Sequence, residues 1–247
     1  MFTLPKFAAL TAPLRPLALC AQGLLRFALP NHCGVCGVAS KDLLCAACRQ
    51  QHFTTVLRCH GCGQRMLDQQ VTHCGACLAD AAPFDRTYAA FDYAAPWDAA
   101  LAALKFGHRL PYAALLAQAW VRQCSAPVPM DCLMPAPLST QRLRERGFNQ
   151  ALEIARHLAR HTQQPLDTHS LVKVRDTPPQ VGLSRKDRLK NVRGAFACVG
   201  KVQGQRIAVV DDVMTSGATL AEIARTLKHA GAASVINIVI ARTPEFH

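Results

Sequence analysis

The sequence predicts an α/β protein, a parallel sheet flanked by helices, preceded by a small cysteine-rich metal-binding module. Eight of the twelve cysteines form four C-x-x-C pairs within the first third of the chain. Downstream, almost entirely apolar runs of strand length alternate with helix-like segments, a pattern typical of strands that are buried on both faces. One of these runs leads into two carboxylates, a glycine-containing loop and a helix, which indicates a ligand site at the end of a strand.

The length of 247 residues accommodates one substantial domain and a smaller one. We expect an N-terminal helical segment over residues 1–30, the cysteine module over 31–80 and the α/β domain over 84–247. Half of the residues are hydrophobic and 18% are charged, which is the composition of a soluble globular protein.

The first 30 residues carry an apolar run after Lys6 that resembles a signal peptide. Pro13, Arg15 and Pro16 interrupt it, and no stretch reaches the roughly 18–20 apolar residues that a membrane span needs. We therefore expect an amphipathic helix over residues 16–29, no transmembrane span and a cytoplasmic protein. Whether this helix touches the inner face of the membrane is left open.

The cysteine pairs are spaced as metal ligands. Cysteines two residues apart make poor structural disulfides and good metal-binding turns, so they indicate a reducing compartment. Chain order assigns four cysteines to each of two sites, although an interleaved pairing or a single metal would also fit. The predicted ligands are Cys33, Cys36, Cys45 and Cys48 at one site, and Cys59, Cys62, Cys74 and Cys77 at the other.

Four soft sulfur ligands favour tetrahedral Zn²⁺ over an iron–sulfur cluster. Because every ligand comes from the protein, no position is left for a reacting water, and we expect one or two structural zinc ions. His32, His52, His60 and His73 flank the pairs and are expected at the surface rather than as ligands. A module of this kind is stabilised by metal rather than by apolar burial.

In the α/β domain the expected elements alternate. The apolar runs 207–210 and 235–240 are the clearest strands. The remaining pattern gives strands or helices over 131–137, 146–160, 171–175, 194–199, 206–212, 217–229 and 234–240.

The segment after the strand at 206–212 carries the decisive motif. Backbone amides at the start of a helix, together with hydroxyl side chains, bind a phosphate dianion. Glycine lets the backbone approach the phosphate closely. Asp211 and Asp212 would repel a phosphate, so they suit the paired hydroxyls of a ribose, directly or through Mg²⁺. The residues of this motif are Asp211, Asp212, Val213, Met214, Thr215, Ser216, Gly217, Ala218 and Thr219.

This motif resembles the phosphoribosyl pyrophosphate (PRPP) loop of type I phosphoribosyltransferases, with Ser216 where many members have threonine. Two basic segments, residues 137–150 with the word Arg-Gly-Phe-Asn-Gln and residues 178–196 with Asn-Val-Arg-Gly-Ala-Phe, extend the resemblance. Together with the four cysteine pairs they are similar to the ComF/ComFC competence family, which includes amidophosphoribosyltransferase-like proteins. The similarity runs from about Leu29 to the C-terminus.

The resemblance implies a type I phosphoribosyltransferase fold with Asp211 and Asp212 on the ribose hydroxyls at the catalytic centre. It also implies that residues 215–219 hold the 5′-phosphate, with Mg²⁺ bound alongside PRPP. Arg144 and Arg146 are the candidates for the pyrophosphate, and residues 173–193 for a loop that closes over the site. No base-recognition segment is identifiable, so the nucleophile stays open.

Two functional hypotheses follow. The first is a ComF-type protein that binds PRPP or a related sugar-phosphate and assists the uptake or processing of single-stranded DNA, with competence or DNA-processing proteins as partners. A formal charge of +12, about +8 with two tetrathiolate zinc sites, fits anionic ligands. Against it, aromatic residues are few, and Phe106, Tyr112, Phe148 and Phe196 are each expected in the core. The second is an active phosphoribosyltransferase of nucleotide salvage or biosynthesis.

Overall fold

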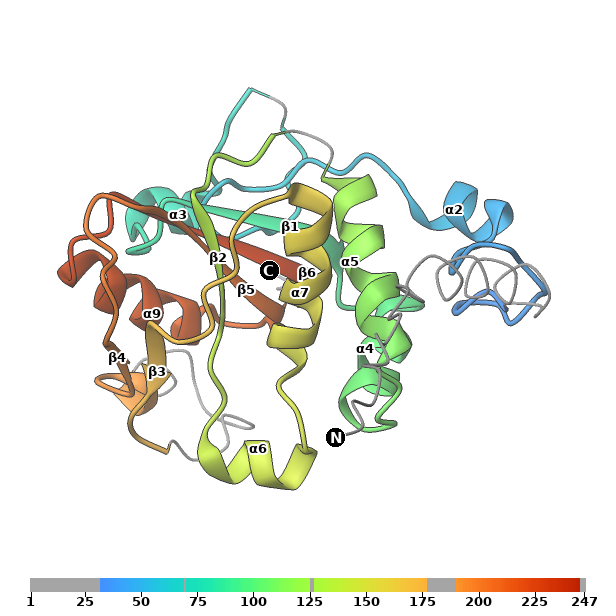
Figure 1. Cartoon of the computed structure of the whole chain (residues 1–247). Helices are drawn as coiled ribbons and strands as arrows, with labels where there is room; N and C mark the ends of the chain where they lie inside the picture. The colour runs from blue at the N-terminus through green and yellow to red at the C-terminus, as the bar shows by residue number, and fades with distance from the viewer. Residues whose placement is uncertain (1–31, 69, 125–126, 177–189, 245–247) are drawn as a thin grey trace, which may run out of the picture. The chain divides into compact units, whose positions relative to one another are not determined.

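A four-stranded parallel sheet with the order β1-β6-β5-β2 organises the fold of the computed structural model, which describes residues 32–68, 70–124, 127–176 and 190–244 (Figure 1). Its strands are β1 (Arg86–Asp92), β2 (Cys132–Pro135), β5 (Arg206–Met214) and β6 (Ser234–Arg242). Each neighbouring pair runs parallel. The expectation of a parallel sheet is therefore confirmed.

Helices cover both faces of this sheet. The helices α5 (Pro111–Gln123) and α7 (Gln150–Thr162) pack on each other and on the strands, and α4 (Trp97–Lys105) packs on α5. The opposite side chains of the strands, among them Ile207, Val209 and Val239, join a core cluster with α9 (Ala218–His229). Most residues of β5 and all but the first residue of β6 are buried, as strands covered on both faces require.

Residues 84–130 fold into β1, α4 and α5, for which the sequence pattern had given no elements. Residues 140–146 form a helix, α6 (Thr140–Arg146), where the sequence predicted only a basic segment ahead of the next helix. Ser139 caps α6 by accepting a hydrogen bond from the Arg142 N–H, and Gly147 ends it with φ +76°. The expected helix 146–160 begins at Gln150, after the Asn149 cap.

A second, two-stranded antiparallel sheet joins β3 (Leu171–Lys173) and β4 (Phe196–Cys198). These strands fall within the expected segments 171–175 and 194–199. The strand at 206–212 and the helix at 217–229 are confirmed, although β5 continues to Met214 because its pairing with β6 persists to Arg242. The expected helix at 16–29 and most of the loop at 173–193 lie outside the described residues.

The chain divides into two compact units, residues 1–46 and 47–247. In the first, an antiparallel bridge joins His32 and Ala39. The second unit contains the short helix α3 (Gly75–Ala79) and most of α2 (Ala46–His52) as well as the α/β core.

Residues 58–65 of the second unit lie along β1, the edge strand of the sheet. The Thr87 N–H donates to the His60 carbonyl over 2.8 Å, and the Arg58 guanidinium forms an ion pair of 2.8 Å with Asp92 at the end of β1. Gly63 lies so close to Thr87 and Ala89 that a Cβ atom there would be 3.1 Å from each side chain. The edge of the sheet is therefore covered by the turn that carries Cys59 and Cys62.

Candidate functional site

A cavity of about 840 Å³ opens beyond the carboxyl ends of β5 and β2. This is where parallel sheets of α/β proteins bind ligands. The predicted motif, which spans the end of β5, the following turn and the start of α9, contributes five of the lining residues, namely Asp211, Asp212, Val213, Thr215 and Thr219. Basic and aromatic residues from other elements complete the wall, among them Lys105, Arg142, Arg146, Lys173 and Phe196.

Residues 211–219, which run from the end of β5 through a short turn into α9, are the segment predicted to bind phosphate, and we call them the phosphate loop. Gly217 adopts φ +75° directly before α9, a left-handed conformation that favours glycine. A Cβ atom there would lie 2.5 Å from Cε of Met214, which is buried beneath the loop. Ser216 Oγ accepts from the Ala218 N–H over 3.4 Å, so it supports the start of the helix.

The two aspartates of the loop differ in their surroundings. Asp212 is buried, and its Oδ2 lies 2.6 Å from Nζ of Lys105, at the end of α4. Burial, and after it the charge of Asp212, raises the pKa of Asp211 to about 8, although hydrogen bonding from the Asp212 N–H and the charge of Lys105 lower it. A neutral Asp211 beside a neutralised Asp212 removes most of the repulsion that two carboxylates would exert on an anionic ligand.

Lys105 is a site residue that sequence reasoning missed. It lies far from the motif in sequence, at the end of helix α4, which packs on α5. Only the tertiary fold brings it to Asp212, and a single lysine in an apolar helix is otherwise no signal of a site.

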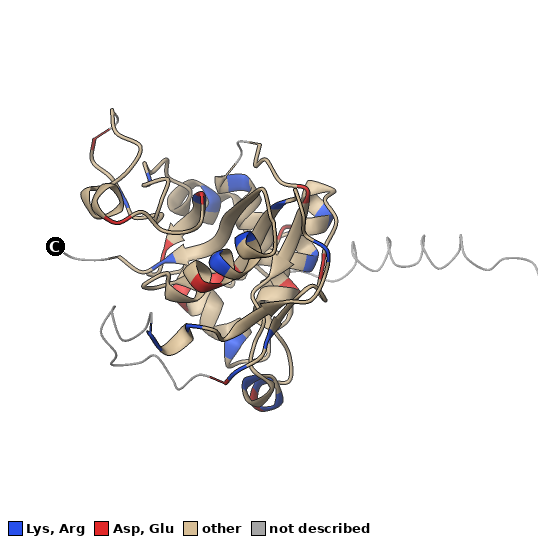
Figure 2. Ribbon diagram, turned by 90° about the vertical axis from the view of Figure 1, so that its left-hand side faces the viewer, with Lys and Arg blue, Asp and Glu red and all other residues tan. Residues whose placement is uncertain are grey.

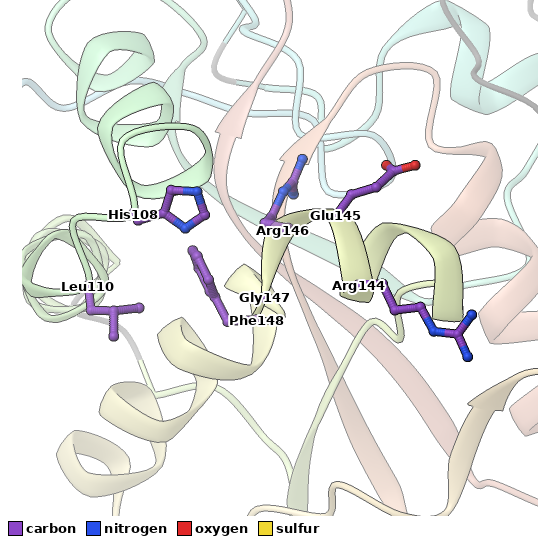
Figure 3. A pocket seen from close by; sticks show the side chains of 7 residues that line it. All are labelled: His108, Leu110, Arg144, Glu145, Arg146, Gly147 and Phe148. Atoms are coloured by element: carbon purple, nitrogen blue, oxygen red, sulfur yellow. The ribbon is translucent and has the colours of Figure 1, made fainter.

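The arginines of α6 are divided between two neighbouring pockets. Arg142 and Arg146 line the main cavity, whereas Arg144 lines a smaller pocket of about 390 Å³ beside it. Arg146 borders both pockets and donates to Oε1 of Gln150 over 2.6 Å. In Figure 3 the side chains of Arg144 and Arg146 point in different directions, and in Figure 2 the lowest helix, α6, is largely basic.

An aromatic group also borders these pockets. The ring of His108 meets the ring of Phe148 edge-on, with centroids 5.9 Å apart (Figure 3). Phe106 is 71% exposed, and the Arg146 guanidinium lies 5.6 Å from its ring centroid. The expectation that Phe106 lies in the core is wrong, because α4 ends at Lys105 and leaves the next side chain outside the packing. Phe196 is buried as expected.

The small sheet β3–β4 supplies the remaining wall of the cavity. Phe196 of β4 and Lys173 of β3 both line it, and Nζ of Lys173 lies 5.8 Å from the Phe196 ring centroid. Burial and the nearby charge of Arg142 lower the pKa of Lys173, while Asp176 raises it. The sequence alone did not identify these two as parts of one surface.

The eight paired cysteines form two groups, with the pairing that chain order predicted. Cys33, Cys36, Cys45 and Cys48 bring their sulfur atoms within 4.8 Å of one another, and so do Cys59, Cys62, Cys74 and Cys77. Distances of this size suit four sulfur ligands around one zinc ion. The other described cysteines, Cys124, Cys132 and Cys198, belong to neither group.

Hydrogen bonds to sulfur support the thiolate form at both groups. The Cys45 N–H donates to Sγ of Cys33 over 3.4 Å, and the Cys74 N–H to Sγ of Cys59 over 3.2 Å. Burial raises the pKa of Cys59, but such backbone donors outweigh it and lower the pKa to about 7.

In the second group, formed by Cys59, Cys62, Cys74 and Cys77, four thiolates would repel one another unless a cation lies between them. Burial and the charge of Cys59 raise the pKa of Cys62 to about 11, against the hydrogen bond from the Gln64 N–H. Burial and the charge of Cys62 raise that of Cys77 further. A divalent ion removes this penalty, since its charge offsets the repulsion between the sulfurs. Both groups are therefore zinc-binding sites of a structural kind.

Comparison with known proteins gives two family matches. Residues 24–78 match the family described as "Double zinc ribbon domain", and residues 143–245 match "Phosphoribosyl transferase domain". Among the described residues no helix is long and apolar enough to cross a membrane.

Three relatives show the family to which the chain belongs. The chain is 34% identical over 220 residues to the "DNA utilization protein YhgH" of Salmonella typhi, covering 86% of this chain and 92% of the relative. It is 31% identical over 204 residues to the "Competence protein F" of Haemophilus influenzae, covering 78% and 87%. It is 34% identical over 117 residues to the "Competence protein ComFC" of Bacillus subtilis, covering 45% and 44%. The chain thus belongs to the ComF/YhgH family, in which a double zinc ribbon precedes a phosphoribosyltransferase domain.

Proposed function

We propose that the chain binds PRPP, or a closely related sugar-phosphate, in the cavity beyond β5 and β2, and that it serves the handling of single-stranded DNA taken up by the cell. The observation that carries this proposal is the phosphate loop itself. One cavity wall combines the adjacent Asp211 and Asp212 with Thr215 and Thr219, at the start of a helix. A helix start binds phosphate, and neighbouring carboxyl groups bind paired hydroxyls.

Each end of PRPP has a chemical counterpart in this cavity. The amides and hydroxyls of residues 215–219 suit the 5′-phosphate, and Asp211 and Asp212 suit the ribose hydroxyls. Arg146 and Arg142, on the α6 side, suit the pyrophosphate because a guanidinium binds phosphate oxygens in pairs. Arg144 faces the smaller pocket and has a lesser part in this assignment.

A magnesium ion would fit this arrangement, since Asp211 and Asp212 offer oxygen ligands beside the place assigned to the ribose. When bound, Mg²⁺ neutralises charge on the pyrophosphate. Lys105 holds Asp212 in place through its ion pair. Without the ion, the raised pKa of Asp211 lets its neutral carboxyl donate a hydrogen bond to a ribose hydroxyl, whereas bound Mg²⁺ would favour its carboxylate form.

Calorimetric titration with PRPP and Mg²⁺ tests the binding. We expect saturable binding to the native chain and its loss in Asp211→Ala/Asp212→Ala. Asp131→Asn is the matched control, because Asp131 pairs with Arg206 where β5 begins, at the opposite end of the strand. Arg146→Gln should weaken binding and Arg156→Gln, which alters an exposed arginine of α7, should not. Equal affinity of all these variants would contradict the proposal.

Transferase activity is the second candidate. The cavity extends past the phosphate loop to Phe196 and Lys173, which leaves a wall for a nucleophile beside the anomeric carbon. Pyrophosphate release from PRPP and Mg²⁺, measured with a panel of bases, decides it. Turnover with one base that is lost in Asp211→Ala/Asp212→Ala would make the chain an enzyme. Binding without release would leave it a PRPP-responsive protein.

The DNA part of the proposal is supported by the names of the relatives, which refer to competence and DNA utilization, and by the basic character of the chain. The exposed Phe106 beside Arg146 adds a stacking surface of the kind that single-strand binders use. We expect salt-dependent binding of a labelled single-stranded oligonucleotide, weakened in Phe106→Ala by about 1–3 kcal/mol. Val199 is an exposed apolar residue of another loop, and Val199→Ala should bind the oligonucleotide as tightly as the native chain does. Absence of binding at 50 mM salt would count against this part.

A further inference from the structure

Arg242, the last residue of β6, lies between the phosphate loop and the second four-cysteine group. Its side chain is buried, with 2% of the residue exposed. Its Nε donates to the Cys62 carbonyl over 2.8 Å, and its Nη1 donates to the carbonyls of Met214 at 3.2 Å and of Thr215. One guanidinium therefore hydrogen-bonds a metal-ligating turn and the first residues of the phosphate loop.

The turn on the cysteine side has a defined position on the sheet. Cys62 is one of four cysteines whose sulfurs lie within 4.8 Å of one another, and Cys62 packs against the core cluster of the α/β domain. The preceding His60 carbonyl accepts from Thr87 of β1, and Gln64 Nε2 donates to the Thr243 carbonyl over 3.0 Å. A metal ion bound by these cysteines would fix the turn and, with it, the Cys62 carbonyl that Arg242 contacts.

On the other side, the contact with Thr215 orients the loop backbone. A peptide unit is planar and trans, so its C=O and N–H groups point in opposite directions. Holding the Thr215 carbonyl toward Arg242 therefore directs the Ser216 N–H away from it. Thr215 also lines the cavity, and β6 pairs with β5 in the register Arg242 to Met214. The start of the phosphate loop is thus positioned by both the backbone and the side chain of Arg242.

We propose that Arg242 is a positioning residue that couples the second zinc site to the phosphate loop, so that metal at Cys59, Cys62, Cys74 and Cys77 sets the loop for phosphate binding. The ligand in this statement rests on the proposed function, but the coupling itself concerns only residues of this chain. Coupling is reciprocal. A ligand bound to the loop must therefore raise the zinc affinity of the second group by the same factor by which zinc raises the affinity of the loop for that ligand.

Hydrogen exchange of the amides of residues 215–219 tests the coupling without any ligand. We expect Cys74→Ser, which removes a zinc ligand of the second group, to speed exchange in this loop by about 5- to 150-fold. Cys45→Ser, the matched change at the first group, should leave it unchanged. Arg242→Met should speed loop exchange by itself, and adding Cys74→Ser to it should bring little further change, because the connection is already broken.

Two outcomes would overturn the inference. One is loop exchange in Cys74→Ser equal to that of the native chain; the other is full additivity of Cys74→Ser and Arg242→Met. Exchange in β2 (Cys132–Pro135) distinguishes coupling from general unfolding, since coupling leaves it unchanged and unfolding speeds both. If Cys74→Ser unfolds the chain, Arg242→Lys with native zinc content is decisive. Altered loop exchange and faster zinc release from the second group alone support the coupling, and native values for both refute it.

PRPP enters as a separate arm. Zinc release to a coloured chelator is followed with and without PRPP and Mg²⁺, and release from the first group is the internal reference. Slower release from the second group only, abolished in Arg242→Met, would support the coupling. If calorimetry detects no PRPP binding, the proposed function fails, and the exchange experiment still decides the coupling. If PRPP binds and release from both groups is unchanged, the coupling fails alone.

Discussion

At the scale of single residues, the site depends on two carboxyl groups in unlike states. Lys105 neutralises Asp212, and the exposed fractions of the two side chains are 16% and 6%. We expect Lys105→Met to lower the free energy of unfolding by about 3 kcal/mol, because it leaves a buried carboxylate without its cation. Urea denaturation measures this, and Lys105→Met/Asp212→Asn should recover part of the loss. A single variant as stable as the native chain would contradict the role of the pair.

Asp211 should give the stability of the chain a pH dependence. Its pKa of about 8 in the folded chain exceeds the ordinary value, so the folded state holds a proton that the unfolded state has lost. Stability then falls as pH rises from about 4 to 8, by up to about 1.4 kcal/mol per pH unit. We expect Asp211→Asn to be more stable than the native chain at pH 8, with a smaller difference at pH 5, and to lose PRPP affinity.

Asp131 is the control for this prediction, because its pKa is shifted in the opposite direction. A hydrogen bond from Arg206 lowers the pKa of Asp131, so its contribution is present at neutral pH and is lost on acidification. Asp131→Asn should therefore not stabilise the chain at pH 8. Thermal unfolding of both variants at the two pH values measures the difference, and an Asp211→Asn variant with an unchanged pH profile would sink the prediction.

At the scale of elements, the turn from β5 into α9 determines the shape of the phosphate loop. Gly217→Ala adds the strain of a left-handed residue, about 1–2 kcal/mol, and a Cβ that must displace Met214. Gly204 has φ +72° with open space around its Cβ direction, so Gly204→Ala carries the strain alone. We expect equal or greater destabilisation by Gly217→Ala in urea, and loss of PRPP binding in that variant only. Native PRPP affinity of Gly217→Ala would contradict this prediction, because it would show that the loop still binds after Met214 is displaced.

At the scale of the whole molecule, we expect zinc to stabilise the edge of the parallel sheet as well as the cysteine module. The turn at His60 covers β1, so its release would expose the edge strand of the sheet to other chains. We expect removal of zinc by chelation to lower the unfolding temperature and to cause concentration-dependent association. Cys45→Ser, which affects the first group, should show less association than Cys74→Ser. Calorimetry and light scattering measure both effects, and a stripped chain that stays monomeric would contradict this account.

The chemistry that is local in the chain can be predicted from the sequence. Ligand spacing two residues apart predicts each metal turn, and the strand–carboxylate–glycine–helix order at Asp211–Gly217 predicts the loop, because hydrophobic period and turn geometry act between near neighbours. The parallel sheet follows from the same apolar runs. The position of Phe106 does not, since this residue was expected in the core and is exposed.

Which distant residues meet at the site follows from the folding of the chain and has no sequence pattern. Lys105 reaches Asp212 across more than a hundred residues, Arg142 and Arg146 face the cavity while Arg144 does not, and Arg242 joins a zinc turn to the loop. No periodic pattern in the sequence predicts these contacts, because each depends on how helices and strands pack and not on neighbours along the chain. The partner of a buried guanidinium or ammonium group is set by the tertiary fold, so the role of the charge can be recognised only once that partner is known.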